Sequence, residues 1–226
     1  MMVSLHPLNA TKIRLIESAM QCFAAHGFEG TSIREIAVGA QANASLVSYY
    51  FGGKAGLYQE TMAYIFQRKV SRLMALLSVL PVGVAVPRLE VIQGLKDYIR
   101  VLVETLMSCS PSNPLDMAAM TLMAREAESP SPVFEPMLKD FMRPFTTYMD
   151  GCLKALRPDL VEDARFAMAL SIQGQVIHLR NALGSLRLLR ENPAYPEDLP
   201  ALIQHFIDFS LRGLSLPEAL DNRDRP

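Results

Sequence analysis

Apolar residues recur every three or four positions along almost the whole chain, which is the spacing of one face of an α-helix. Strand-like alternation never persists, and no turn dipeptide joins two alternating segments. Prolines and glycines divide the pattern into about nine helical segments, so the sequence predicts an all-α fold. The expected helices are 11–26, 32–40, 44–51, 54–81, 89–108, 115–128, 133–156, 160–190 and 198–213.

Several local signals mark where these helices begin, end and bend. Gly27 predicts a helix stop, and Ser32 with Glu35 has the spacing of a capping box. Asn43 is the expected N-cap of the third helix. Pro144 lies inside the seventh helix and should kink it.

Composition excludes several broad classes of protein. Of the 226 residues, 50% are hydrophobic and 20% are charged, which argues against a disordered chain. The net charge of −1 excludes a protein held on acidic partners by bulk positive charge, although residues 1–80 carry seven basic and four acidic residues. No signal peptide and no apolar segment of membrane-spanning length is visible, so we expect a soluble cytoplasmic protein.

The reactive side chains do not form a catalytic or metal-binding pattern. Three cysteines fit free thiols in a reducing compartment, with buried packing favoured over a redox-sensing role. No nucleophile motif, phosphate loop or metal-ligand spacing occurs, so we expect no enzyme, no catalytic residues, no metal and no cofactor. The residues concerned are Cys22, Cys109, Cys152, His6, His26, His178 and His205.

The two short segments at 32–40 and 44–51 form a candidate helix-turn-helix. Val47 and Phe51 can face the core of such a unit, while the opposite face can enter a major groove. That face carries Ala44, Ser45, Ser48 and Tyr49. The same spacing also occurs in helical bundles that bind no DNA.

The segment 27–59, GFEGTSIREIAVGAQANASLVSYYFGGKAGLYQ, resembles the N-terminal domain of the TetR/AcrR family of transcriptional repressors. The resemblance implies a DNA-binding domain at 8–56, with its helix-turn-helix at 32–51. A long fourth helix would then lead into a ligand-binding and dimerisation domain at 57–214, followed by a mobile tail at 215–226. The matching residues are Gly27, Thr31, Ser32, Ile36, Ala37, Tyr49, Tyr50, Phe51, Lys54 and Leu57.

The later sequence resembles the ligand domain of the CecR-like branch of these regulators. The resemblance lies in Ala124-Arg125-Glu126, Ser129-Pro130-Ser131-Pro132, Arg143-Pro144, Gly174-Gln175 and the segment 208–214.

The resemblance also implies which residues contact DNA: Ser32, Arg34, Ala44, Ser45, Ser48, Tyr49, Tyr50 and Lys54. Ser32 could serve only as a cap, Tyr50 could pack in the core, and Lys54 could be a solvated charge. Gln41 stands where the family usually has Gly, which predicts a different turn geometry. Residues 44–51 contain no Arg, Lys, Asn or Gln, so Arg34 is the expected guanine contact.

Methionines, aromatic residues and a few polar residues of the C-terminal part are candidates for an effector pocket, although each could be ordinary core. The candidates are Met107, Met117, Met120, Arg125, Phe134, Met137, Phe141, Phe145, Tyr148, Gln173 and His178. Gln175, Arg180 and Asn181 also interrupt the eighth helix with polar groups. Arg125 and Glu126 could pair with each other or with a neighbouring helix.

The last two helices have apolar faces that predict a dimer interface. The expected interface residues are Leu170, Val176, Ile177, Leu183, Leu202, Phe206 and Phe209. The family resemblance implies a four-helix bundle across a twofold axis. Two DNA-binding heads would then meet a palindrome whose half-sites lie about 34–36 Å apart.

The sequence therefore predicts a homodimeric DNA-binding repressor that a small apolar effector releases from its operator. Family analogy suggests control of an efflux or detoxification system. The alternative is a ligand-sensing helical dimer without specific DNA binding. Neither the effector nor the operator can be read from the residues.

Overall fold

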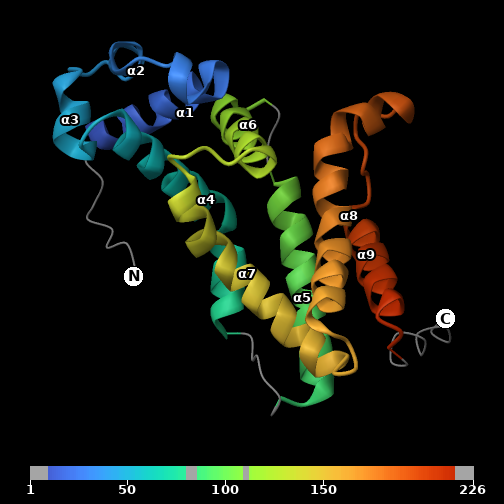
Figure 1. The fold of residues 1–226 in the computed structure, drawn as a ribbon. Helices are drawn as coiled ribbons and strands as arrows, with labels where there is room; N and C mark the ends of the chain where they lie inside the picture. Colours follow the sequence, from blue (N-terminus) through green and yellow to red (C-terminus); the bar gives the residue numbers. More distant parts are fainter. Residues whose placement is uncertain (1–9, 80–85, 109–111, 217–226) are drawn as a thin grey trace. The chain divides into compact units, whose positions relative to one another are not determined.

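The computed structural model describes residues 10–79, 86–108 and 112–216, and all regular structure within these ranges is helical (Figure 1). The all-α prediction is therefore confirmed, with nine helices in the described residues. They are α1 (Ala10–Gly30), α2 (Ile33–Gly39), α3 (Ser45–Phe51), α4 (Lys54–Val79), α5 (Arg88–Met107), α6 (Pro114–Glu128), α7 (Glu135–Leu156), α8 (Glu162–Leu189) and α9 (Leu199–Gly213). None of these helices is long and apolar enough to cross a membrane.

The helices form two compact units. Unit 1 consists of Met1–Lys69 and Cys109–Phe141, and unit 2 consists of Val70–Ser108 and Met142–Pro226. Contacts thus group α6 and the first residues of α7 with the N-terminal helices. The division into a DNA-binding domain at 8–56 and a ligand-binding and dimerisation domain at 57–214 stays a prediction. Of the expected mobile tail, residues 217–226 lie outside the described residues, and Leu216 is buried.

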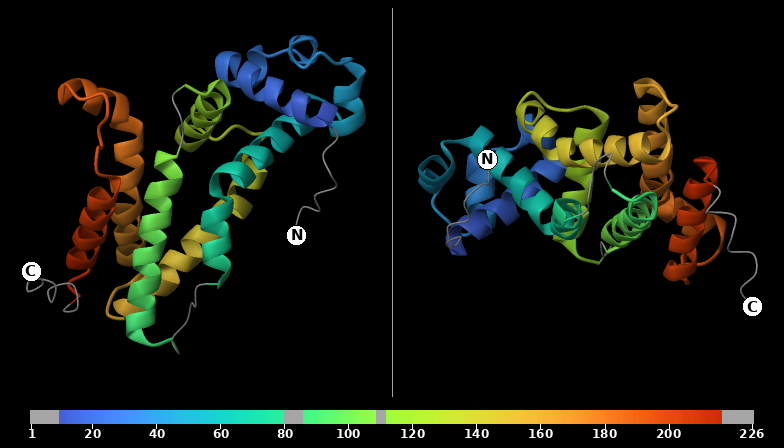
Figure 2. Two further views of the ribbon diagram at one scale, coloured as in Figure 1. Left: turned by 180° about the vertical axis from the view of Figure 1, so that it is seen from behind. Right: turned by 90° about the horizontal axis from the view of Figure 1, so that it is seen from below.

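Unit 1 is built around α1, which packs against α2 and α6 (Figure 2). Leu15 and Phe23 of α1, Ile36 of α2 and Val47 of α3 are fully buried in its core. Leu122 of α6 joins the same core, which shows that the N-terminal helices do not bury their apolar faces alone. Burial of this apolar area is the main force that holds the short helices α2 and α3 in place.

Unit 2 contains α5, α8 and α9, which contact one another pairwise (Figures 1 and 2). Their buried apolar residues follow helical spacing, as Leu95, Ile99 and Val103 of α5 show. The C-terminal half of α7 completes this core through Met149 and Leu153.

The local signals at Gly27 and Ser32 are confirmed. Gly27 has φ 73° and ψ 176° and interrupts α1, which resumes for one short turn. Ser32 caps α2, since its side chain accepts a hydrogen bond of 3.1 Å from the backbone N–H of Glu35. The helix α7 continues through Pro144, and the kink expected there stays a prediction.

Three buried groups in unit 2 predict loss of stability in alkali. Burial raises the pKa of Tyr98 from 10.0 to about 12 and that of Cys152 from 9.0 to about 11, and it also raises the pKa of Tyr148. The folded state keeps these protons after the unfolded chain has released them. Its stability is therefore complete below about pH 9 and falls as the pH rises through the folded pKa values.

We expect urea unfolding near pH 11 to give a free energy about 3–5 kcal/mol below that near pH 8, since each unit of pKa shift is worth about 1.4 kcal/mol. The Cys152→Ala variant should lose less over the same range. An equal loss in that variant would assign the effect to other groups.

Candidate nucleic-acid interface

Polar contacts from α1 fix the position of α2. The Ser18 hydroxyl donates to the Ile36 carbonyl at 2.8 Å, and Arg14 Nε donates to the Ala40 carbonyl at 3.1 Å. Gly39 allows this close approach, because a Cβ there would lie 2.5 Å from Ser18 Oγ. The carbonyl end of α2 is thus tied to α1, which leaves its other face outward.

The turn after α2 keeps a left-handed residue. Gln41 has φ 50°, so the expected change of turn geometry is wrong. Backbone N–H groups of Gln41 and Ala42 donate to the carbonyls of Val38 at 3.0 Å and Ala37 at 2.9 Å. These bonds and the buried Ala40 hold the residue in a conformation that costs roughly 1–2 kcal/mol for a non-glycine residue.

The helix α3 has one buried and one exposed face, as the sequence predicts. Val47 and Phe51 are buried. Ala44, Ser45 and Ser48 are exposed, and Tyr49 is 79% exposed. A short polar face of this kind at the surface of a helix-turn-helix fits the dimensions of a major groove.

The start of α3 differs by one residue from the prediction. Ala44 occupies the N-cap position and has no side-chain cap. Asn43 lies one residue earlier, and its Oδ1 accepts from Ser45 N and Ser45 Oγ, each at 2.9 Å. Asn43 therefore orders the first turn of α3 from outside the helix, in the manner of an Asx turn.

The remaining predicted DNA contacts lie on the same unit. The Arg34 side chain is exposed and makes no hydrogen bond or ion pair within the described part of the chain. Tyr49 and Tyr50 pack edge to face with ring centroids 5.0 Å apart, and Tyr50 is half-buried. Lys54 Nζ donates to the Glu29 carbonyl at 3.2 Å and lies 4.7 Å from the centre of the Phe28 ring.

Comparison with protein families gives two adjoining matches. Residues 15–61 match the model of bacterial regulatory proteins of the tetR family. Residues 95–214, more than half of the chain, match the C-terminal domain of the HTH-type transcriptional dual regulator CecR. The chain belongs to the TetR family. It is a helix-turn-helix transcriptional regulator with a CecR-type C-terminal domain, and proteins of this family and fold act as regulators rather than enzymes.

Curated relatives match over the DNA-binding part. The TetR-family chain is 45% identical over 58 residues to the probable HTH-type transcriptional regulator YttP of Bacillus subtilis. It is 42% identical over 53 residues to the HTH-type transcriptional repressor SCO4008 of Streptomyces coelicolor. These matches span 26% and 24% of this chain and 28% of each relative.

Solved structures match over nearly the whole length and show the same fold. A candidate transcriptional regulator from Pseudomonas aeruginosa PAO1 has a TM-score of 0.64 at 21% identity, with 94% of this chain and 93% of that chain covered. A complex of SmeT with triclosan has a TM-score of 0.61 at 16% identity, with 91% of each chain covered.

The predicted effector-pocket residues are divided between the two units. Met117, Met120, Arg125, Phe134, Met137 and Phe141 belong to unit 1, whereas Met107, Phe145, Tyr148, Gln173 and His178 belong to unit 2. In unit 1, Phe134 is buried, and its ring and that of Phe141 stack on Phe66, so both aromatics contribute to the core.

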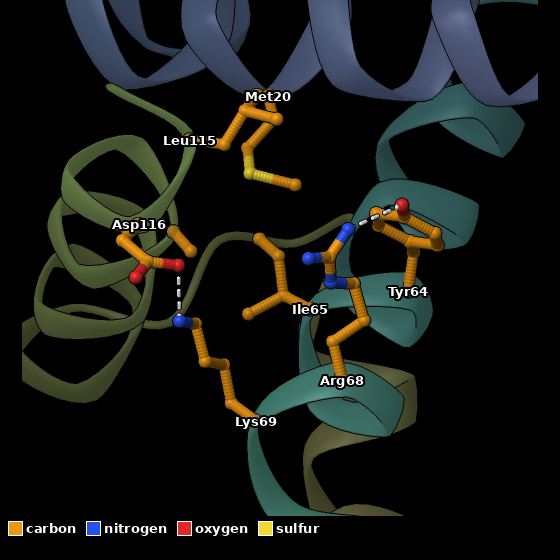
Figure 3. Close-up of a pocket in the computed structure, with 8 residues that line it drawn as sticks. Met20, Tyr64, Ile65, Arg68, Lys69, Leu115 and Asp116 are labelled. Atoms are coloured by element: carbon orange, nitrogen blue, oxygen red, sulfur yellow. Dashed lines mark hydrogen bonds and ion pairs between the residues drawn. The ribbon is translucent and has the colours of Figure 1, made fainter. Parts of the chain in front are cut away.

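A small cleft in unit 1 is lined by none of the predicted pocket residues (Figure 3). Its sides include Met20, Ile65 and Leu115, and the ion-paired side chains of Lys69 and Asp116 also line it. The cleft has room for about one water molecule, which is too little for an effector.

Arg125 of α6 donates hydrogen bonds to the backbone of α1. Its guanidinium donates to the carbonyls of Phe23 at 2.8 Å and Ala24 at 3.1 Å. These carbonyls lie in the last turn before the break at Gly27, where a helix leaves carbonyls without intrahelical donors. Arg125 of α6 therefore caps the carbonyl end of this helical segment. It pairs with a neighbouring helix and not with Glu126.

Glu126 forms a buried network that sequence reasoning did not specify. Its side chain is 2% exposed and accepts from the Tyr58 hydroxyl and, at 2.7 Å, from the backbone N–H of Ser131. Burial and the adjacent Glu126 raise the pKa of Tyr58. The acidic side chain next to Arg125 near the end of α6 was the available signal, but its partner Tyr58 lies 68 positions away in the sequence.

The predicted dimer residues separate into two groups. Val176 and Phe206 lie in the core of unit 2, Leu202 packs partly buried against that core, and Leu183 is buried, so these four residues offer little surface to a partner. Leu170, Ile177 and Phe209 are 53%, 47% and 60% exposed. These three exposed residues are accessible to a partner, and a dimer interface through α8 and α9 stays a prediction.

The described cysteines are poor candidates for redox sensing. Burial and the nearby Glu35 raise the pKa of Cys22, and burial raises that of Cys152 to about 11. Both thiols thus stay protonated at neutral pH, and the thiolate is the reactive form. Cys109 lies outside the described residues.

Proposed function

We propose that this TetR-family regulator is a homodimeric repressor that binds a palindromic operator through α2 and α3. Two observations carry the proposal: α3 has an exposed face of small polar residues, and the guanidinium of Arg34 on α2 is exposed and unpaired among the described residues. The end of α2 is tied to α1 by the hydrogen bonds from Arg14 and Ser18. Arg34 reads a guanine in this proposal, while Ala44, Ser45 and Ser48 supply methyl and hydroxyl contacts.

Phosphate contacts come from the elements around this face. Ser32 stands at the N-terminus of α2, where backbone N–H groups favour an anion. Tyr49 and Tyr50 reach the DNA backbone from the end of α3. Lys54 keeps further N–H donors besides the one used by Glu29, so its ammonium can also meet a phosphate.

Dimerisation supplies the affinity that one weakly basic head lacks. Two linked heads bind one palindrome with a high effective concentration for the second contact. The exposed apolar residues Leu170, Ile177 and Phe209 support this pairing, since large exposed apolar patches mark interaction sites.

A small apolar effector releases the repressor by binding better to the state that fits the operator poorly. An effector shifts the equilibrium only by its differential affinity for the two states. The regulated genes in this proposal encode an efflux or detoxification system. The structural likeness to SmeT, solved with triclosan, makes triclosan a reasonable first apolar probe.

Fluorescence anisotropy tests the repressor proposal directly. Labelled duplexes come from the region upstream of the coding sequence and from a random pool enriched with the purified protein. Tight binding at two protomers per site, surviving unrelated competitor DNA and moderate salt, is the expected result. Binding that disappears with competitor would favour a ligand-sensing dimer without specific DNA binding.

Replacement of Arg34 by Ala tests the base reader. We expect a loss of about 1–3 kcal/mol on the enriched duplex and a relaxed preference at one base pair per half-site. The Arg212→Ala variant removes the same charge from an exposed position of α9 and should bind as the wild type does. Equal weakening of Arg34→Ala on every sequence would make Arg34 a phosphate contact.

A further inference from the structure

One arginine of α8 has no partner within the described residues. Arg165 pairs with Asp150 at 2.7 Å, and Arg187 donates to the Tyr195 carbonyl at 2.9 Å. Arg180, in contrast, makes no hydrogen bond or ion pair there, and its Nε is buried. A buried N–H without an acceptor costs free energy, so it calls for an unseen acceptor.

The surroundings of Arg180 are apolar. Its neighbour Leu179 on α8 is buried in the core of unit 2, together with Val176, and Leu183 of the same helix is buried as well. The Arg180 side chain itself is partly buried. An ion pair formed here would be stronger than one in open solvent, because the local dielectric is lower.

A second hydrogen-bond donor without an acceptor among the described residues lies in the same unit. Tyr98 of α5 is 1% exposed, and its hydroxyl accepts from Gln173 Nε2 at 2.7 Å. The hydroxyl proton has no acceptor among the described residues, and burial keeps it in place by raising the Tyr98 pKa to about 12. Gln173 and Arg180 are seven residues apart on α8, so they share one face about 10 Å apart.

We propose that Arg180 and Tyr98 are the polar contacts of an effector site in unit 2, and that the effector is an apolar molecule bearing a carboxylate. The carboxylate accepts from the Arg180 guanidinium, and the Tyr98 hydroxyl donates to a second acceptor or to the same acid. Both free groups are donors, and one is a cation, so the site disfavours a cationic effector. This inference rests on the proposed function, in which a small apolar effector releases the repressor, and it places the binding site of that effector in unit 2.

Thermal unfolding of the full-length protein tests the ligand class. The probes are decanoate, decanol and decyltrimethylammonium, which share a ten-carbon chain and differ in charge, with octanoate and dodecanoate to vary the length. We expect at least one acid to raise the unfolding midpoint in a saturable manner, while the alcohol and the cation do not. Stabilisation by decanol or by the cation equal to that by the acids would overturn the proposal, as would the absence of stabilisation by any acid.

Two variants separate recognition from folding. Arg180→Met removes the guanidinium but keeps the length and apolar character of the side chain. It should unfold at or above the wild-type temperature without ligand and should lose at least tenfold in acid affinity. Arg190→Met is the matched control, because Arg190 ends the same helix and stacks 4.9 Å from the Tyr195 ring centre. Acid binding by Arg180→Met equal to that of the wild type would refute the role of Arg180.

DNA release distinguishes this inference from the proposed function. If an acid stabilises the wild type through Arg180 but leaves operator binding unchanged, the ligand site stands and the repressor mechanism fails. If the operator is bound and released by neutral or cationic probes instead, the repressor mechanism stands and the acid site fails.

Discussion

Gly56→Ala should unfold or displace the helix-turn-helix. A Cβ at Gly56 would lie 1.8 Å from the backbone carbonyl oxygen of Phe51, the last residue of α3. Neither atom is at the end of a flexible side chain, so α3 and α4 would have to move apart by more than an ångström. We expect a loss of about 3 kcal/mol or more in unfolding free energy and no specific DNA binding.

Gly184→Ala is the matched control for this substitution. Gly184 lies inside α8, and nothing lies within 4 Å of the Cβ that would be added. Because Ala is the better helix former, this variant should gain up to about 1 kcal/mol. Wild-type stability and DNA affinity in Gly56→Ala would show that α4 does not approach α3 as closely as described.

Tyr58→Phe should destabilise the chain by about 2–3 kcal/mol in urea unfolding. The substitution removes the hydroxyl donor to Glu126 and leaves a buried carboxylate with only the Ser131 N–H. A buried charged group that loses a hydrogen-bond partner bears most of its desolvation cost.

Tyr64→Phe is the control on the same helix, since its hydroxyl donates to Glu17 at 3.1 Å in a half-buried position. That variant should lose less than about 1 kcal/mol. The double variant Tyr58→Phe, Glu126→Leu should recover part of the loss, because it removes both buried polar partners. A small effect of Tyr58→Phe alone would show that the hydroxyl of Tyr58 does not stabilise the buried side chain of Glu126.

The sequence by itself determined the helical fold and the character of the DNA-facing surface. Helical spacing of apolar residues and the Pro and Gly breaks placed the helices, and local rules placed the cap at Ser32 and the break at Gly27. The outward face of α3 followed from one helical period, because Val47 and Phe51 had to point inward. The family resemblance rested on the same short-range pattern and is confirmed by the matches at 15–61 and 95–214.

Only the tertiary structure decided which polar residues pair and which are left without a partner. Arg125 caps α1 about a hundred residues earlier in the chain, and Glu126 meets Tyr58, so neither partner is visible at local range. Packing also separated Val176, buried in the core, from the adjacent Ile177, exposed on the same helix. Helical period gives the direction of a side chain but not the element that covers it, and that depends on long-range contacts. For the same reason, the unsatisfied Arg180 could be identified only after every other arginine of its helix had been paired.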